Sequence, residues 1–305
     1  MTEDIKFNRK FECEYGVMVE VTPLIRRIVA NNPGPYTFMG TGTYVVGRGK
    51  VAVIDPGPAY PEHVDALLAG LEGEEITHQL ITHTHVDHSP AAELVKQRTG
   101  AKTYGFGPHG AGKYEKDAVV EAGGDKDFVP DVILKDSDVV EGPGGDNNWT
   151  LDCVHTPGHT SNHLCYHLRE ENALFPGDHV MGWSTTVVSP PDGDMADYMA
   201  SLRMLAERSD AIYYPTHGGP IKRPQRYVRG ILVHRKQRES QILECLDQGV
   251  TNISAMVDRM YQDLDPRLTG AAGHSVFSHI IDLAERGIIA SDGEISLAAE
   301  YQKSR

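Results

Sequence analysis

Residues 81–90 read ITHTHVDHSP and place three histidines and one aspartate within six consecutive positions. These side chains are His83, His85, Asp87 and His88, in a chain that has 15 histidines among 305 residues. Residues two apart on an extended chain point to the same side, so we expect His83 and His85 to share one face. Two imidazoles placed in this way can hold one metal ion at about 2.0–2.1 Å. Asp87 and His88 follow where the chain must bend, and we expect them to face a second ion.

The residues on either side of this cluster indicate a strand that runs into the histidines and a helix that follows them. Residues 76–83, ITHQLITH, read as a strand. Residues 89–100 predict a helix with Ser89 as N-cap, Pro90 in the first turn and Gly100 as the stop. A carboxylate among histidines at such a junction is far more specific than a chance group of surface histidines. The stretch therefore favours a metal site.

Further candidate ligands occur later in the chain, each where a predicted strand ends beside glycine or proline. They are His159 in TPGHT, Asp178 in FPGDH and His217 in PTHGG. Glycine next to a ligand allows the backbone to bend and to approach closely. Asp55 in VIDPGP lies at another strand end of this kind. We expect these residues to complete the site.

Up to about residue 225 the chain alternates strand and helix signals. The predicted strands, rich in Val and Ile or ended by Gly or Pro, are residues 42–49, 50–58, 101–106, 149–159 and 211–219. A hairpin is predicted from residues 163–168 and 172–178, and helices from residues 61–71 and 195–208. Residues 107–130 and 141–148 are rich in Gly and Asp and predict loops. This order indicates an α/β layered fold.

From about residue 226 the pattern becomes helical, so we divide the chain into domains at 1–225 and 226–305. Helices are expected at residues 227–249, 252–262 and 273–287, and a hairpin with Asp-Gly at its turn is expected within residues 288–297. Helices followed by two strands suggest a winged-helix-like module, whose third helix often contacts DNA. Here that helix carries Asp282 and Glu285 against Arg286. This favours a structural or homodimer-forming module and disfavours duplex DNA as a partner.

The composition is that of a globular protein with an acidic surface. The net charge is −14 and the pI is about 5.5, whereas a protein that binds nucleic acid over its whole surface is basic. No apolar run approaches the roughly 20 residues of a membrane helix, and the first residues show no targeting signal. Cys13, Cys153, Cys165 and Cys245 form no metal or disulfide pattern. We expect a cytoplasmic protein with no membrane partner.

The HxHxDH motif of residues 83–88, followed by His159, Asp178 and His217, resembles the signature of the metallo-β-lactamase superfamily. The resemblance covers about residues 35–220 and implies a four-layer αββα sandwich with a dinuclear zinc site at one edge. In that site two Zn²⁺ ions per chain would be held by two groups of three ligands: His83, His85 and His159 for the first ion, and Asp87, His88 and His217 for the second. Asp178 and a hydroxide would bridge the ions, and Asp55 would support the site from behind. The helical tail is similar to the lactamase-β-like subgroup that ends in a winged-helix domain.

The resemblance implies a zinc-dependent hydrolase. Two ions about 3.5–4 Å apart share one water, whose pKa falls to roughly 7, so that it becomes a nucleophile without a side-chain base. The ions also stabilise charge on the attacked carbonyl or phosphoryl oxygen. Asp87 and Asp178 are the expected catalytic residues, since Asp87 can orient the hydroxide and Asp178 bridges the ions.

Other residues near the expected site are assigned to supporting or substrate roles. His163 lies four residues after His159 and either supports a ligand or contacts substrate. The segment 222–238 carries seven Lys or Arg and no acid, and Arg235 and Arg238 within it would share a helix face. They could hold a substrate phosphate or carboxylate. Residues 182–194 are apolar and proline-rich and are expected to line the pocket.

The sequence is compatible with several classes of substrate. The expected bond is an ester-like, amide or phosphodiester bond in a small-molecule or single-stranded anionic substrate, since subgroup relatives include single-stranded RNA endonucleases. A β-lactam-hydrolysing enzyme is a weaker alternative, because such enzymes usually carry Cys or Ser where this chain has Asp178 and are exported. A thioesterase similar to glyoxalase II shares the ligands, although its glutathione-binding tail has no recognisable match. An iron-dependent oxidoreductase similar to persulfide dioxygenases is the alternative from another class.

Overall fold

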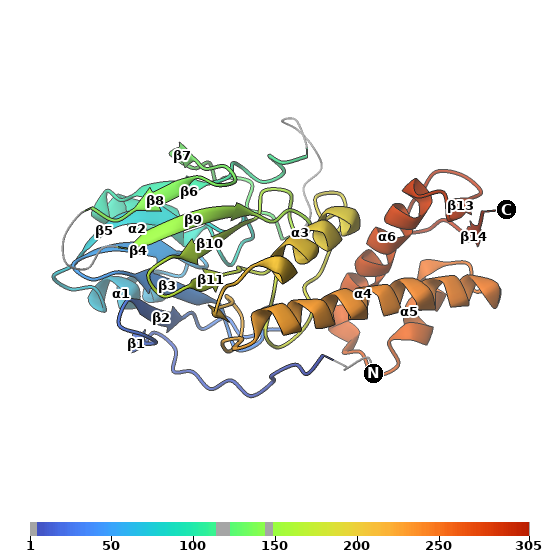
Figure 1. Cartoon of the computed structure of the whole chain (residues 1–305), viewed down its shortest axis with the longest axis horizontal. Coiled ribbons are helices and arrows are strands. Elements are labelled where there is room, and N and C mark those ends of the chain that lie inside the picture. Colours follow the sequence, from blue (N-terminus) through green and yellow to red (C-terminus); the bar gives the residue numbers. More distant parts are fainter. Residues whose placement is uncertain (1–4, 114–122, 144–148, 305) are drawn as a thin grey trace.

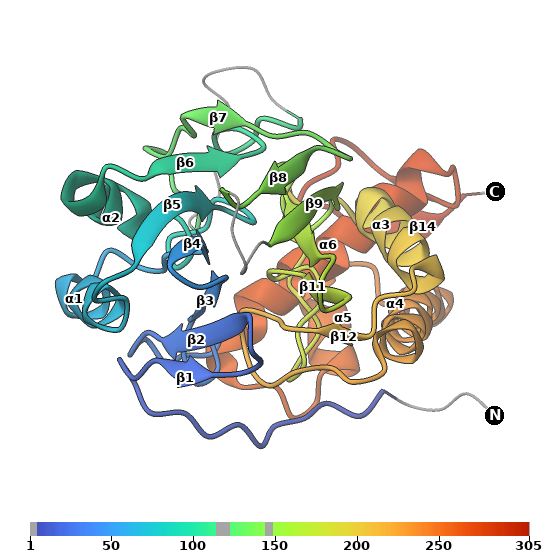
Figure 2. The ribbon, with the colours of Figure 1, turned by 60° about the vertical axis from the view of Figure 1, so that its left-hand side comes forward.

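The computed structural model describes residues 5–113, 123–143 and 149–304, which form two facing β-sheets with helices on both outer faces (Figures 1 and 2). The first sheet has the order β1-β2-β3-β4-β5-β6-β7, and β4 to β7 run parallel. Its strands are β1 (Val19–Glu20), β2 (Ile25–Val29), β3 (Gly42–Val46), β4 (Lys50–Ile54), β5 (Glu75–Leu80), β6 (Lys102–Gly105) and β7 (Val132–Ile133).

The second sheet has the order β12-β11-β10-β9-β8. Its strands are β8 (Val139–Glu141), β9 (Thr150–His155), β10 (Leu164–Leu168), β11 (Ala173–Phe175) and β12 (Ile212–Tyr213). The predicted hairpin is confirmed, because β10 pairs antiparallel with β11 through Tyr166 opposite Phe175. The predicted loop at 141–148 begins at the last residue of β8, and part of it, like part of the loop at 107–130, lies outside the described residues.

Four helices complete the layers, as Figure 2 shows from the side. On the outer face of the first sheet lie α1 (Pro61–Ala69) and α2 (Ala91–Thr99), and on that of the second lie α3 (Met195–Glu207) and α4 (Pro224–Asp247). Between the sheets, Tyr44 and Ile54 pack against Tyr166 and Phe175. A separate apolar cluster lies between the first sheet and its helices and contains Leu67 of α1. The four-layer αββα arrangement is therefore confirmed.

The remaining elements form a small unit beyond the sandwich, at the far end of α4 in Figure 1. It contains α5 (Ile253–Met260), a 3₁₀ turn η1 (Pro266–Leu268), α6 (Thr269–Glu285), β13 (Ile289–Ser291) and β14 (Tyr301–Lys303). The expected wing within residues 288–297 is wrong in one respect: β13 pairs with β14, which begins four residues later, at Tyr301. The Asp-Gly turn is therefore only the start of a longer loop.

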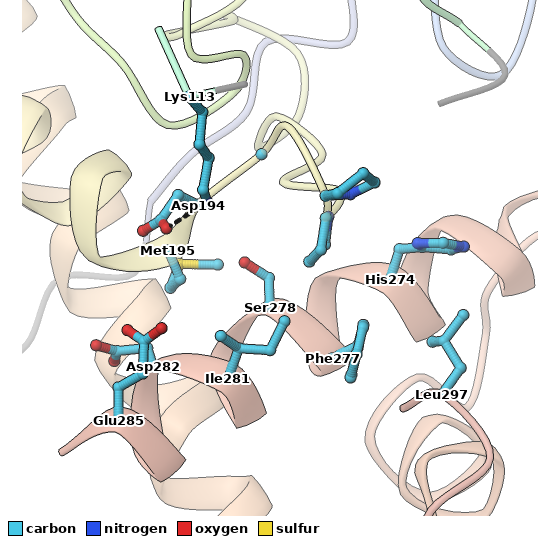
Figure 3. Close-up of a pocket in the computed structure, with 13 residues that line it drawn as sticks. Lys113, Asp194, Met195, His274, Phe277, Ser278, Ile281, Asp282, Glu285 and Leu297 are labelled. Carbon is cyan, nitrogen blue, oxygen red and sulfur yellow. Dashed lines mark hydrogen bonds and ion pairs between the residues drawn. The ribbon is translucent and has the colours of Figure 1, made fainter. Parts of the chain in front are cut away.

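The helix α4 links the sandwich to this unit without interruption. Near its start, Val228 and Ile231 pack with α3 on the second sheet, whereas Ile242 and Cys245 pack with α5 and α6. The division of domains at residue 225 stays a prediction, because one continuous helix crosses it. A cavity lies between α6 and the segment that leads into α3 (Figure 3). Across the parts of the chain that the structure describes, no helix meets the length and apolarity that a membrane span requires.

Candidate metal centre

The candidate ligands follow strand ends at one edge of the sandwich. The sequence suggested that His83 and His85 lie on an extended strand. In the structure β5 ends at Leu80, and both histidines lie in the loop that follows it. The chain also enters α2 one residue later than expected, because Ala91 begins the helix and Ser89 bonds Asp125 instead of capping it. Ligands that follow strands of two sheets can converge because those strand ends meet at one edge.

Two glycines are required where the later ligands approach. Gly177 precedes Asp178 and has a φ of +50°, and a Cβ there would lie 2.7 Å from His163 Nε2. Gly158 precedes His159 with a φ of +133°, and a Cβ there would collide with the backbone of Tyr198. Only glycine fits both the backbone angle and the space, so these turns place their ligands close to the site.

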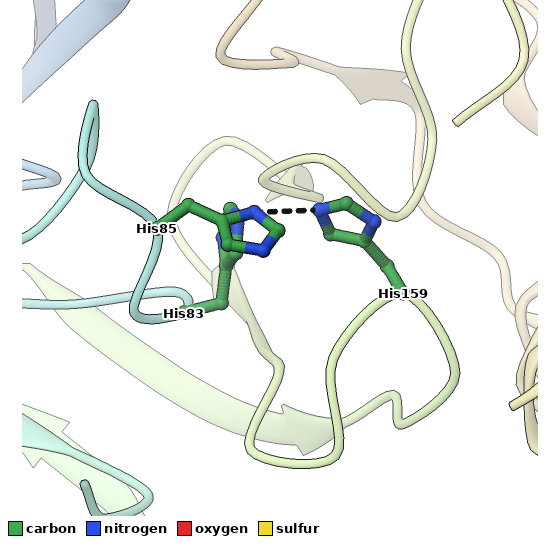
Figure 4. A group of neighbouring side chains, drawn as sticks. All are labelled: His83, His85 and His159. Atoms are coloured by element: carbon green, nitrogen blue, oxygen red, sulfur yellow. Dashed lines mark hydrogen bonds between the residues drawn. The ribbon is translucent and has the colours of Figure 1, made fainter. Parts of the chain in front are cut away.

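The first ligand group consists of three imidazoles (Figure 4). His83 Nε2 lies 2.9 Å from His85 Nδ1, and His159 Nε2 lies 3.1 Å from the same His85 atom. Although the two residues leave the strand, His83 and His85 do present nitrogens to a common point. His83 and His159 are buried, while His85 is partly exposed. The structure thus brings together all three ligands expected for the first ion.

The second ligand group combines two imidazoles with carboxylates. His88 Nε2 and His217 Nε2 lie 3.4 and 3.2 Å from Asp87 Oδ2. The same two nitrogens lie 3.6 and 3.3 Å from Asp178 Oδ2. Asp178 also belongs to a set with His83 and His88, so it lies between the two groups, where a bridging ligand is expected.

The ring nitrogens that face away from the centre have protein partners. His88 Nδ1 is 2.9 Å from Asp55 Oδ2, and His217 Nδ1 is 3.1 Å from the carbonyl oxygen of Gly40. His159 Nδ1 is 2.7 Å from the carbonyl oxygen of Val187. Donation from Nδ1 directs Nε2 inward as the atom available to a metal ion, which is how ligand histidines are oriented in metal sites.

Asp55 holds several parts of the site together. It is 1% exposed, has a φ of +49°, and accepts hydrogen bonds from the backbone N–H and the hydroxyl of Thr82 as well as from His88. A positive φ is uncommon outside glycine and is maintained only where the surroundings demand it. The expected support from behind the metal site agrees with this placement.

The two groups differ in their electrostatics. Burial lowers the pKa of His83, and the neighbouring imidazoles of His88 and His85 lower it further. For His217, burial also lowers the pKa, but the carboxylates of Asp178 and Asp87 outweigh it and raise the pKa to about 10. Burial raises the pKa of Asp178, yet His217 and His88 hold it well below its usual range. Burial and neighbouring imidazoles therefore favour the neutral form of His83, whereas the second group is a network of ion pairs.

The residues present fit a dinuclear zinc site. Seven ligands with imidazole nitrogens and carboxylate oxygens are the donors that zinc accepts. Two of their buried atoms, His88 Nε2 and Asp178 Oδ1, make no hydrogen bond to any described residue. Buried polar atoms are nearly always paired, so unpaired atoms that point to one centre indicate a missing partner. The identity and number of the metal ions stay predictions.

His163 and His179 lie behind the ligands and not at the open side. His163 is 0% exposed, bonds the hydroxyl of Thr156 through Nδ1, and stacks on His83 with ring centroids 5.1 Å apart. His179 is also 0% exposed and packs on Tyr198. Of the two roles expected for His163, support of a ligand suits this position better than contact with substrate.

Arg235 is buried and Arg238 is half-buried, and both are engaged with other parts of the protein. Arg235 is 2% exposed, donates a hydrogen bond to the carbonyl oxygen of Thr186, and lies over the ring of Tyr198. Arg238 donates to the carbonyl oxygen of Met260 and lies 4.2 Å from the centre of the Tyr261 ring. Both arginines therefore make structural contacts. The other five basic residues of the segment are exposed: Lys222, Arg223, Arg226, Arg229 and Lys236.

Several residues of the site were missed from the sequence. The hydroxyl of Thr41 donates to Asp87 Oδ2 at 2.8 Å, and the hydroxyl of Thr186 lies 3.1 Å from His159 Nδ1. Thr41 carries no spacing signal, because its contact with Asp87 spans 46 positions. Thr186 belongs to the segment 182–194 that was expected near the site. Thr186 connects Arg235 to the ligand His159, because its carbonyl oxygen accepts from Arg235 and its hydroxyl contacts His159.

Comparison with known proteins gives the same assignment. The family described as the metallo-beta-lactamase superfamily matches residues 36–217, and the beta-lactamase associated winged helix domain matches residues 253–297. A metallo-β-lactamase family protein from Thermus thermophilus, known from a crystal structure, has the same fold with a TM-score of 0.76 and 20% identity. That match covers 93% of this chain and 100% of the other.

Two fungal relatives are similar in sequence. The lactamase-like protein adaB of Aspergillus niger is 32% identical over 243 residues, which are 77% of this chain and 68% of that protein. The atrochrysone carboxyl ACP thioesterase of Aspergillus terreus is 30% identical over 303 residues, which are 94% of this chain and 85% of that protein. Fold, ligand pattern and sequence agree, and the chain belongs to the metallo-β-lactamase superfamily of metal-dependent hydrolases, with a C-terminal winged-helix domain.

Proposed function

We propose that this protein is a dinuclear zinc hydrolase that cleaves thioesters, with an acyl group delivered on a small thiol or on a carrier protein. The observation that carries the proposal is the convergence of seven ligands at one edge of the sandwich, in a chain that aligns along 94% of its length with a relative named as an ACP thioesterase. Hydrolysis of a thioester needs a nucleophilic water and stabilisation of the carbonyl oxygen, which such a site supplies.

In this proposal the seven ligands divide between two ions as the resemblance to the superfamily implies. His83, His85 and His159 would hold the first ion, and Asp87, His88 and His217 the second, with Asp178 between them. When bound, the two zinc ions supply Lewis acidity and lower the pKa of a shared water to near neutrality. Every other contribution comes from side chains of the chain itself.

Asp87 is the residue best placed to orient the attacking water. Its side chain is 19% exposed, more than that of Asp178 at 11%, so it faces the open side of the site. One carboxylate oxygen, Oδ2, accepts the hydroxyl hydrogen of Thr41 and is held in place by that bond. A fixed carboxylate beside the water can accept its hydrogen bond and so orient it. Val86, next to Asp87 and 51% exposed, marks the open side.

The alternatives considered from the sequence differ in how well the structure supports them. The RNA endonuclease hypothesis depended on the basic segment, but Arg235 is buried and Arg238 bonds a backbone carbonyl oxygen. The β-lactam and iron dioxygenase hypotheses make different demands on substrate and metal, so turnover and metal content separate them. Cytoplasmic location and homodimer formation stay predictions.

The proposal is tested by metal analysis together with a comparison of substrates. We expect about two zinc ions per chain and release of free thiol from a naphthoyl thioester of N-acetylcysteamine, with no turnover of a fluorogenic RNA. Nitrocefin serves as the β-lactam substrate. Saturation at one iron per chain would contradict the zinc assignment, and turnover of nitrocefin or RNA without thioester hydrolysis would contradict the thioesterase assignment.

A further inference from the structure

The cavity beside α6 has the size and the lining of a small ligand pocket. Its volume is about 340 Å³, and ligand pockets occupy about 300–1,000 Å³. Figure 3 shows α6 on one side and the start of α3 on the other. The apolar part of the lining consists of Pro190, Pro191, Met195, Phe277, Ile281 and Leu297. The cavity is therefore formed by both the sandwich and the winged-helix domain.

One wall of this cavity is hydrogen-bonded to the loop that carries the ligand His159. The backbone N–H of Asp194 donates to the carbonyl oxygen of Gly158 at 2.9 Å. Asp192 accepts from the backbone N–H of Ser161 at 3.1 Å and from its hydroxyl at 2.5 Å. The wall of the cavity and the loop that carries His159 are thus held together by hydrogen bonds.

A buried hydroxyl in the cavity lacks a partner. Ser278 is 2% exposed, and its Oγ makes no hydrogen bond to any residue that the structure describes. Figure 3 shows this hydroxyl directed across the cavity towards Met195. A buried polar group without a partner is costly, and a ligand atom that accepts or donates one hydrogen bond would satisfy it.

The charges around the cavity disfavour an anion. Lys113 contributes one positive charge, but it is paired with Asp194 at 2.7 Å. Asp282 and Glu285 add two further carboxylates to the lining, and Asp282 is paired with Arg286 at 3.0 Å. A bound carboxylate or phosphate would meet three carboxylates and one lysine, so the net charge of the lining repels an anion.

We propose that this cavity binds the acyl group of the thioester substrate, and that the group is uncharged, largely apolar and bears an oxygen that bonds Ser278. The inference rests on the proposed thioesterase function and adds the substrate class and the position of the acyl group. Apolar walls bind the body of the group, the Ser278 hydroxyl fixes its orientation, and the carboxylates exclude acyl groups that end in a second acid.

The first test measures binding and does not depend on catalysis. The probe is 2-naphthol, which is neutral, two-ringed and bears one hydroxyl, and titration of the zinc-loaded protein gives its Kd. Ile281→Trp fills the cavity and should weaken binding about 10-fold or more, because the ring and the new side chain need the same space. Ser278→Ala should weaken it about 3- to 10-fold through loss of one hydrogen bond.

The controls are made at Ser254, which is exposed on α5 and does not line the cavity. Ser254→Trp and Ser254→Ala repeat the two substitutions in the same domain and should leave the Kd unchanged. The anion 2-naphthoate should bind at least about 10-fold more weakly than 2-naphthol to the wild-type protein. Equal affinity of the Ile281→Trp variant and the wild type, or no saturable binding of 2-naphthol, would overturn the assignment of the cavity.

A turnover experiment separates failure of this inference from failure of the proposed function. With acetyl and naphthoyl thioesters of N-acetylcysteamine, Ile281→Trp should raise the KM of the naphthoyl substrate about 10-fold or more and leave the acetyl substrate unaffected. Turnover of both substrates with no effect of the substitution would overturn the cavity assignment alone. Intact binding of 2-naphthol with no hydrolysis of either thioester would overturn the thioesterase function, and with it the acyl assignment.

Discussion

Two groups of buried histidines in this protein differ in the charges that surround them. At the metal centre, the Nε2 atoms of His88 and His217 lie 3.2 to 3.6 Å from the carboxylates of Asp87 and Asp178. Between α4 and α6, His279 is 3% exposed, and neither of its ring nitrogens has a hydrogen-bond partner among the described residues. Its charged neighbours are arginines.

The pKa values show the consequence of that difference. Burial lowers the pKa of His279 to about 3, and Arg235, His234 and Arg238 add to the effect. Burial and the same two arginines lower the pKa of His234 to about 4. His217 has an equally buried ring, yet the carboxylates raise its pKa to about 10. Burial and neighbouring cations therefore favour a neutral packing histidine, and the nearby carboxylates set the second ligand group apart from it.

The largest effect is expected when the bridging carboxylate is removed. Asp178→Asn replaces a charged ligand that reaches both groups by a neutral amide of the same size. We expect at least about a 100-fold loss of thioester turnover and a lower zinc content, measured by thiol release and by elemental analysis. Wild-type turnover and zinc content in this variant would contradict the bridging role.

The next largest effect is expected when a histidine of the metal centre is replaced, and a histidine from between α4 and α6 serves for comparison. His88→Ala should lower zinc from about two ions per chain to about one, because His88 belongs to the carboxylate-containing group. His279→Ala should leave the zinc content at the wild-type value, since no carboxylate completes a site there. Zinc titration followed by elemental analysis gives both numbers. Equal losses of zinc in the two variants would show that neighbouring carboxylates do not decide which of these histidines binds metal.

A smaller effect is expected when Arg235, which links the α4–α6 histidine group to the metal centre, is replaced. Arg235 donates to Thr186, whose hydroxyl lies beside Nδ1 of His159, so Arg235→Ala should loosen this ligand. We expect about 10-fold weaker affinity for the first zinc ion, measured by competition with a chelator. Arg229→Ala is the matched control, because Arg229 on the same helix also donates to a backbone carbonyl oxygen, that of Ala206. Equal affinities in both variants would limit Arg235 to packing.

The last effect bears on stability and not on metal binding or turnover: a pH dependence that arises from His279. Its folded-state pKa of about 3 lies below the ordinary value of 6.5, so the unfolded chain binds a proton that the folded chain does not. Stability should therefore fall as the pH falls from about 6.5 to about 3, by up to about 1.4 kcal/mol per pH unit for this group. Urea unfolding of metal-free protein should show a shallower slope for His279→Gln. A variant with the wild-type slope would contradict the lowered pKa.

Much of the candidate site could be predicted from the sequence, because its residues lie in short local patterns. His83, His85, Asp87 and His88 are neighbours along the chain, and the other ligands lie beside glycine or proline at strand ends. Such patterns follow from the local geometry that a metal ion demands. The placement on a strand was wrong, since β5 ends at Leu80, yet the imidazoles converge because the loop brings them to one point.

Residue types at short spacing were enough to predict the candidate ligands, the layered α/β class and the change to a helical tail. Contacts between distant elements were not predictable in this way: they set what Arg235 bonds, where the wing closes at Tyr301, and how α6 forms a cavity with the segment before Met195. A basic segment on a helix has the same spacing whether it faces solvent or another helix. Packing between distant elements decides that question, because burial depends on what lies opposite a side chain and not on its neighbours in the chain.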